Sequence, residues 1–122
     1  MHELGIVFEI VKRVELAAVE NLLALPDIAA VVVEVGEAST IVPKYLRECW
    51  PAAIDGTDLK DAELDVEIIV ATVRCKACGN VYEYLNRGKV CPDCGSPECV
   101  MVTGQELNIR EIQVFEPDEE KI

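Results

Sequence analysis

Apolar residues recur every three or four positions in the first part of the chain, and this spacing predicts an amphipathic helix over residues 3–25. The apolar stripe comprises Leu4, Val7, Phe8, Val11, Val14, Ala18 and Leu22. Pro26 and Asp27 end the helix, because proline cannot continue it. Residues 28–35 are rich in valine, whose branched side chain favours strands, so we expect a well-buried strand that ends at Gly36.

The pattern continues with a second helix and a second strand. Pro43 suits the first turn of a helix, which is expected over residues 43–53. After a turn at residues 55–58, apolar residues alternate with acidic ones and then give way to an apolar run. This pattern predicts a strand over residues 64–73 with one solvated face.

Strand character returns in residues 106–115, where the apolar positions change phase near Arg110 and Glu111. A change of phase within one strand predicts a β-bulge. If this last strand pairs with residues 28–35 or 64–73, residues 73–102 are an insertion in the domain that these strands form.

Four of the six cysteines form two pairs, each with a two-residue gap, and twelve residues separate the pairs. They are Cys75, Cys78, Cys91 and Cys94. A two-residue gap lets both sulfurs of a pair reach one ion at about 2.3 Å, and four sulfurs complete a tetrahedron. Gly79 and Gly95 follow the pairs and permit the tight turns that point backbone amides at the sulfurs. The spacing predicts a structural zinc site.

A hairpin with arms at residues 81–85 and 89–90, around residues 86–88, fits the gap between the pairs. The alternative is a pair of disulfides. No apolar segment follows a basic start at the N-terminus, as a secretory signal would require, so a reducing cytoplasm is expected. Thiols in that compartment bind metal more readily than they form disulfides.

The expected fold is therefore α/β (α+β), with two helices packed on a small three-stranded sheet and an inserted zinc-ribbon-like module of short β-hairpins. Residues 1–72 plus 103–116 are expected to form the α/β domain and residues 73–102 the zinc-binding module. The module is too short to bury a core of its own, so metal must supply its folding energy. Residues 117–122 form an acidic tail that is expected to be disordered.

Composition excludes several classes of function. The 122 residues suit one compact domain with an appendage, and hydrophobic residues make up 51% of them. No run reaches the roughly 18 apolar residues of a membrane span. The 23 acidic and 11 basic residues give a net charge of -12, and the basic ones are scattered among acids. Because nucleic-acid affinity rests on clustered basic residues, a nucleic-acid ligand is not expected; cations and basic proteins suit this surface better.

The chain has one histidine, at position 2. A Ser/His/Asp or Cys/His arrangement would need this terminal residue as its base, and the sequence has no nucleophile-elbow or nucleotide-binding motif. We therefore expect no enzymatic activity. The terminus does offer chelation, because the Met1 amine, the His2 backbone nitrogen and imidazole, and a Glu3 carbonyl, carboxylate or amide can surround one ion. Ni(II) and Cu(II) prefer such tetragonal sites. The alternative is a solvated histidine without a role.

Four sequence motifs, each present once, follow one another along nearly the whole chain. They are Met1-His2-Glu3-Leu4, Val33-Glu34-Val35-Gly36-Glu37, Cys75-x2-Cys78 with Cys91-Pro92-Asp93-Cys94-Gly95-Ser96, and Gly104-Gln105-Glu106-Leu107. Together they resemble the HypA family of nickel metallochaperones, which serve hydrogenase maturation. The combination of an N-terminal Met-His-Glu with a late four-cysteine site is more specific than either part.

The resemblance implies a domain that binds Ni(II) through His2 and neighbouring atoms of the first residues, with zinc held by the four paired cysteines. It implies delivery of nickel, together with a nickel-handling GTPase, to the large subunit of [NiFe] hydrogenase; some members also serve urease. A homo-oligomer is compatible with this family. The family often has other residues at Gly5 and at Ala38-Ser39, and these departures leave the ligands intact.

Some family members have histidines beside the second cysteine pair; this chain has none there, so a pH-sensing zinc loop is not expected. Cys49 is expected to be a small buried hydrophobe. Cys99, five residues after Cys94, could replace Cys94 in the zinc site, although Cys94 has the better spacing.

Two other functions fit the cysteines. A rubredoxin-like electron carrier would hold iron with the same four sulfurs, but the twelve-residue gap is short for it and the α/β domain has no role in it. A zinc-ribbon protein-interaction module would bind no nickel.

Overall fold

The computed structural model describes residues 2–85 and 88–116. Its elements in chain order are helix α1 (His2–Glu20), the short 3-10 helix η1 (Leu25–Asp27), strand β1 (Ile28–Gly36), helix α2 (Pro43–Ile54), and strands β2 (Glu63–Ile69), β3 (Thr72–Cys75), β4 (Val81–Glu83), β5 (Cys99–Thr103) and β6 (Leu107–Val114). Within the described residues, neither helix combines the length and the apolar character that crossing a membrane requires.

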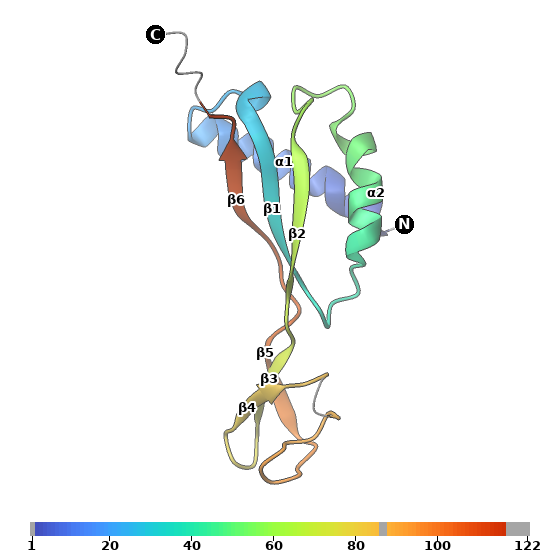
Figure 1. The fold of residues 1–122 in the computed structure, drawn as a ribbon, viewed down its shortest axis with the longest axis vertical. Helices are drawn as coiled ribbons and strands as arrows, with labels where there is room; N and C mark the ends of the chain where they lie inside the picture. Colours follow the sequence, from blue (N-terminus) through green and yellow to red (C-terminus); the bar gives the residue numbers. More distant parts are fainter. Residues whose placement is uncertain (1, 86–87, 117–122) are drawn as a thin grey trace. The chain divides into compact units, whose positions relative to one another are not determined.

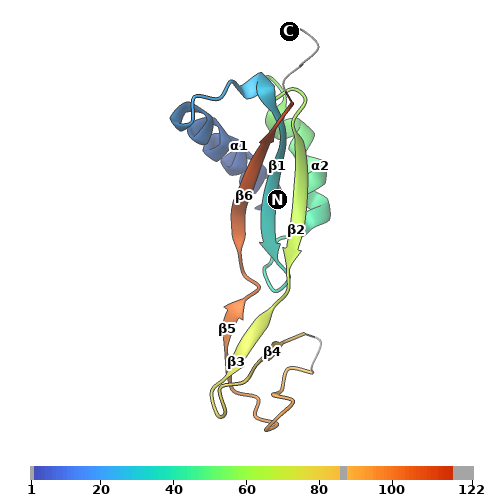
Figure 2. The same ribbon diagram turned by 60° about the vertical axis from the view of Figure 1, so that its left-hand side comes forward.

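Strands β2, β1 and β6 form a three-stranded sheet in that order. In Figure 1, β1 and β2 run in the same direction and β6 runs against them. Helix α2 connects the two parallel strands, which makes a β-α-β unit. Both views place α1 and α2 on the same face of the sheet (Figures 1 and 2). The predicted α/β fold with two helices on a three-stranded sheet is confirmed.

The central strand is buried along nearly its whole length, as its valine-rich sequence predicts. Val31, Val33 and Val35 are fully buried. The helices contribute a stripe of apolar side chains to the same core; the members under 6% exposed are Val7, Ile10, Val11, Val14, Ala18, Leu46, Trp50 and Ala53. Trp50 also donates a hydrogen bond from its indole nitrogen to the carbonyl of Ala62, at 3.0 Å, so its one polar atom is satisfied.

A second small sheet contains β4, β3 and β5 in that order. It corrects two predictions. The single strand expected over residues 64–73 is divided into β2 and β3, which belong to different sheets. Strand β4 pairs with β3 and not with residues 89–90, so the hairpin encloses the first cysteine pair. Residues 86–87 lie outside the described residues.

Helix α1 ends at Glu20 and not at residue 25, which corrects a third prediction. Leu22 adopts a left-handed conformation with φ 56°, and the amides of Leu22 and Leu23 bond back to the carbonyls of Val19 and Ala18 at 3.3 and 2.8 Å. These two bonds form a Schellman cap, a helix ending that usually has glycine at the left-handed position. The apolar periodicity continues past the cap, so the sequence pattern does not show where the helix ends.

Contacts within the chain define two compact units. The first, called here the helical unit, comprises residues 1–33, 41–66 and 109–122, and the second, the cysteine unit, comprises residues 34–40 and 67–108. The domain boundaries predicted from sequence, 1–72 plus 103–116 and 73–102, stay a prediction. The tail at residues 117–122 lies outside the described residues.

Three segments of the cysteine unit cross at a point that admits no side chain. A Cβ atom built on Gly36 would lie 2.0 Å from the carbonyl oxygen of Gly104, and one built on Gly104 would lie 2.6 Å from the Cα atom of Ala71. The Glu37 carboxylate joins two of the segments, because it accepts the Ala71 amide at 2.7 Å. The Glu106 carboxylate accepts the amide of Gly104, two residues earlier in its own segment, at 2.7 Å and fixes the local turn. The Gly-Glu and Gly-Gln-Glu motifs are therefore parts of one crossing.

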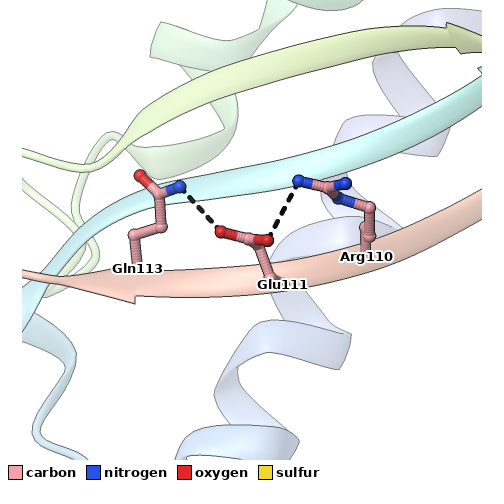
Figure 3. Close-up of polar contacts among 3 residues, drawn as sticks. All are labelled: Arg110, Glu111 and Gln113. Atoms are coloured by element: carbon pink, nitrogen blue, oxygen red, sulfur yellow. Dashed lines mark hydrogen bonds and ion pairs between the residues drawn. The ribbon is translucent and has the colours of Figure 1, made fainter.

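The change of phase in β6 is present. Ile109 and Ile112 are half-buried, and the consecutive residues Arg110 and Glu111 are both exposed. Glu111 accepts hydrogen bonds from Arg110 at 3.0 Å and from Gln113 at 2.7 Å, and all three side chains rise from the same side of the strand (Figure 3). Neighbours in a regular strand point to opposite sides, so this arrangement supports the β-bulge, which stays a prediction.

Candidate metal centres

The two cysteine pairs have the same backbone geometry. In each pair the carbonyl of the first cysteine accepts the amide of the glycine four residues later, from Gly79 at 2.9 Å and from Gly95 at 2.8 Å. Both glycines have positive φ, at 80° and 76°, which a residue with a Cβ atom adopts only at a cost. The amides of the first cysteines, Cys75 and Cys91, donate five residues onward, at 2.8 and 3.0 Å.

These turns bring four sulfur atoms together. The Sγ atoms of Cys75, Cys78, Cys91 and Cys94 lie within 4.8 Å of one another. The pairs Cys75–Cys94 and Cys78–Cys91 are each 3.5 Å apart. A regular ZnS4 tetrahedron with bonds of about 2.3 Å has edges of about 3.8 Å, so the cluster fits one zinc ion.

Backbone amides stabilise negative charge on the first sulfur of each pair. The Cys78 amide lowers the pKa of Cys75, and the Ala77 amide, 3.3 Å from the Cys75 sulfur, adds to the effect. Burial raises the pKa of Cys91, but the amides of Cys94 and Asp93 outweigh it and lower the pKa to about 6. The first sulfur of each pair is thus favoured as a thiolate, which is the form that binds metal.

The pKa of the second sulfur of each pair is raised and not lowered. The Asn80 amide lowers the pKa of Cys78, but the Cys91 sulfur and burial raise it to about 12. The Ser96 amide likewise lowers the pKa of Cys94, and the Cys75 sulfur with burial raises it overall. Two anionic sulfurs thus hold their neighbours in the thiol form, and a dication would displace those protons.

The remaining cysteines lie in different elements. Cys49 is half-buried in α2, and Cys99 is half-buried at the start of β5. Cys99 is not among the four clustered sulfurs of the described residues; it lies opposite Cys75 in the sheet. Strand β5 itself was not predicted, because its apolar residues show no strict alternation.

The N-terminal residues are described only in part. Met1 lies outside the described residues, and His2 is described through its backbone alone, as the first residue of α1. The Glu3 carboxylate accepts a hydrogen bond from the Val42 amide at 3.3 Å, at the position preceding α2. No sequence signal points to this contact between residues 39 positions apart, because a single exposed acid has many possible partners.

The fold and the sulfur cluster together define a metal-binding protein of two units, one of them built around four cysteines. Comparison with known proteins identifies the family. The family described as "Hydrogenase/urease nickel incorporation, metallochaperone, hypA" matches residues 1–114. The chain belongs to the HypA family.

Relatives match along their whole length. A "Hydrogenase maturation factor HypA" of Chlorobium limicola is 37% identical over 118 residues, which cover 97% of this chain and 100% of the relative. One of Desulfosudis oleivorans is 33% identical, with coverage of 95% and 100%. The "Solution structure of HypA protein" has a TM-score of 0.68 at 25% identity and covers 94% of this chain and 97% of its own.

The "Solution structure of the Ni metallochaperone HypA from Helicobacter pylori" has a TM-score of 0.65 at 24% identity, with coverage of 94% and 98%, and supports the fold. The predicted family and fold class are confirmed by these findings. Nickel is the cargo of this metallochaperone family, and the four-cysteine group is consistent with structural zinc.

Proposed function

We propose that the protein binds Ni(II) at its N-terminus and delivers it during [NiFe] hydrogenase maturation, with zinc in the cysteine cluster as a structural ion. The observation that carries the proposal is the closure of the cluster: four sulfurs within 4.8 Å of one another fill all four positions of a tetrahedral ion. A saturated site offers no open position for an ion that must be exchanged. The nickel ligands therefore lie elsewhere in the chain.

The N-terminus offers ligands suited to Ni(II). Position 2 carries the only histidine of the sequence. The amides of the first turn of a helix have no carbonyl partner within the helix, and α1 begins at His2, so the backbone nitrogens of His2 and Glu3 are available as ligands. With the Met1 amine and the His2 imidazole they supply four nitrogens, the tetragonal set that Ni(II) prefers.

The Glu3 side chain has a different task in this proposal. One of its oxygens accepts the Val42 amide at 3.3 Å and so ties the first turn of α1 to the start of α2. A carboxylate with this contact positions the terminus, and the backbone nitrogen of Glu3 supplies the metal ligand. The negative charge of the Glu3 carboxylate also attracts an incoming Ni(II) ion.

The partners follow from the family. A nickel-handling GTPase of hydrogenase maturation and the large subunit of [NiFe] hydrogenase are the proposed partners, with urease as a further recipient class. A homo-oligomer is compatible with this role. The proposed location is the cytoplasm. The mechanism is capture and release of the ion without catalysis, which a terminal and exchangeable site permits.

Titration of untagged protein tests the nickel site. His2→Ala is expected to abolish stoichiometric nickel binding in isothermal titration and to leave the zinc content unchanged, because the two sites share no ligand. Extra residues before Met1 should weaken nickel binding and alter its absorption spectrum, since they remove the amine.

Glu3→Gln is the matched control, because glutamine retains a carbonyl oxygen for the Val42 amide and lacks the carboxylate. Its nickel affinity should stay within a few-fold of the original. Unchanged affinity in His2→Ala would contradict the site. Elemental analysis after nickel exposure separates the alternatives, since a rubredoxin-like protein would contain iron and an interaction module zinc alone.

A further inference from the structure

Cys99 lies directly opposite the zinc-site residue Cys75. Strands β3 and β5 are antiparallel, and their register pairs Cys75 with Cys99. Residues opposed in neighbouring strands project their side chains to the same face of the sheet, with Cβ atoms about 4.5–5.5 Å apart. The two thiols therefore share one face of the small sheet.

Backbone hydrogen bonds identify the kind of pair. The Lys76 amide donates to the Glu98 carbonyl at 3.1 Å, one position beyond Cys75 and Cys99, whereas the Cys75 amide turns the other way and donates to Asn80 at 2.8 Å. The cysteines thus form a non-hydrogen-bonded pair, whose Cα atoms lie about 4.5 Å apart and whose side chains are closest. That separation lies within the range of about 4.4–6.8 Å found for disulfides.

The hydroxyl of Tyr82 is buried near the two cysteines. Tyr82 is 6% exposed, and its hydroxyl oxygen makes no hydrogen bond of ordinary geometry among the described residues. Tyr82 packs with Cys75 and Cys91, and Cys99 packs against this cluster. A buried hydroxyl without a hydrogen bond therefore lies in the cluster against which Cys99 packs.

We propose that Cys75 and Cys99 are a redox-active thiol pair whose cross-strand disulfide removes one ligand from the zinc site. This proposal rests on the zinc occupancy proposed above and goes beyond it. Cys49 has no such arrangement, since it lies in α2 of the helical unit.

The oxidant is a peroxide. It converts the Cys99 thiolate to a sulfenic acid and releases hydroxide. The Cys75 thiolate then attacks the Cys99 sulfur, the S–S bond forms, and a second hydroxide leaves, with the Tyr82 hydroxyl placed to donate a hydrogen bond to it. The two hydroxides take one proton from the Cys99 thiol and one from solvent, because the zinc-bound Cys75 carries none. The two sulfurs are oxidised and the peroxide is reduced to two waters. A zinc ion at this site would then keep three sulfur ligands and would be held more weakly.

The experiment uses zinc-loaded, untagged protein treated with hydrogen peroxide, with zinc release followed by a chromophoric chelator. A glutamate-specific protease cuts after Glu83, Glu98 and Glu106 and places Cys99 in a peptide of residues 99–106, separate from residues 68–83. Tandem mass spectrometry then assigns the disulfide. The expected product is a 68–83 peptide joined to 99–106 through Cys75.

Cys99→Ser should slow zinc release about tenfold, because the thiol that traps Cys75 is gone. Cys49→Ser, the matched control, should release zinc at the original rate. Tyr82→Phe should slow the cross-link and keep the zinc content. Release from Cys99→Ser at the original rate, or disulfides confined to the four clustered cysteines, would overturn the pair.

Zinc content measured before oxidation tests the occupancy separately. A Cys75–Cys99 cross-link in protein that was isolated without zinc would contradict the structural zinc and support the pair. Zinc-loaded protein that forms no such cross-link would contradict the pair and support the zinc.

Discussion

The helical unit packs a broad set of aliphatic side chains between two helices and a sheet, whereas the apolar cluster of the cysteine unit consists of Val73, Cys75, Tyr82 and Cys91. Two of these four residues are sulfur ligands of the candidate zinc site. In the helical unit the hydrophobic effect is sufficient to order the chain. In the cysteine unit Cys75 and Cys91 belong to both the core and the metal site, so we expect packing there to depend on the ion.

Zinc removal is the strongest test of this difference. A chelator should unfold residues 73–102 and leave the helices intact, because structural zinc contributes on the order of 10–16 kcal/mol in zinc peptides. The single tryptophan, Trp50, lies in α2 and reports on the helical unit alone. Its fluorescence should stay unchanged while amide exchange in β3, β4 and β5 becomes fast. Loss of the Trp50 signal on chelation would show that the units depend on one another.

The second test perturbs the helical unit and leaves the cysteine unit unchanged, by creating a cavity in the core of the helical unit. Leu46 is fully buried, and Leu46→Ala should lower the free energy of unfolding by about 2–5 kcal/mol. Denaturant titration followed through Trp50 measures this, and zinc content should be retained. Leu16 on α1 is 62% exposed, so Leu16→Ala is the surface control, with a change of about 0.5 kcal/mol or less. A Leu46→Ala protein that lost zinc would weaken the distinction between the units.

A smaller effect is expected at the end of α1. Leu22 is 94% exposed and occupies a left-handed conformation, so it makes little use of its side chain and carries backbone strain. Leu22→Gly should raise the free energy of unfolding by about 1 kcal/mol, because glycine adopts this conformation without strain. Thermal unfolding of the helical unit would detect the increase. A lower midpoint would mean that the leucine has a contact of its own.

The sequence was sufficient for features that depend on local pattern. The spacing of Cys75, Cys78, Cys91 and Cys94 predicts the sulfur cluster, since each pair needs only a turn that glycine permits. The valine run predicts the central strand, because burial on both faces leaves a continuous apolar sequence. The pairing of β6 with β1 also agrees with the expectation that the last strand returns to the sheet formed by the first part of the chain.

Features that depend on tertiary contacts could not be predicted in this way. The break between β2 and β3 at Val70 and Ala71 leaves no trace in an apolar run, since it arises where Gly36 and Gly104 cross the chain. The end of α1 was missed because Leu22 is apolar in phase and yet closes the cap. The carboxylate of Glu37 was read as part of a motif, and only the fold reveals its partner, Ala71.

The order of the strands has a consequence for biosynthesis. The central strand β1 pairs with β6. The Gly36 amide donates a hydrogen bond at 2.9 Å to the carbonyl of Glu106, which is synthesised seventy residues later. Domains fold as units while synthesis proceeds, at about 5–20 residues per second. All four clustered cysteines therefore leave the ribosome before the sheet can be completed. A nascent chain can therefore bind zinc before strand β6 has been synthesised and has completed the sheet that the helices cover.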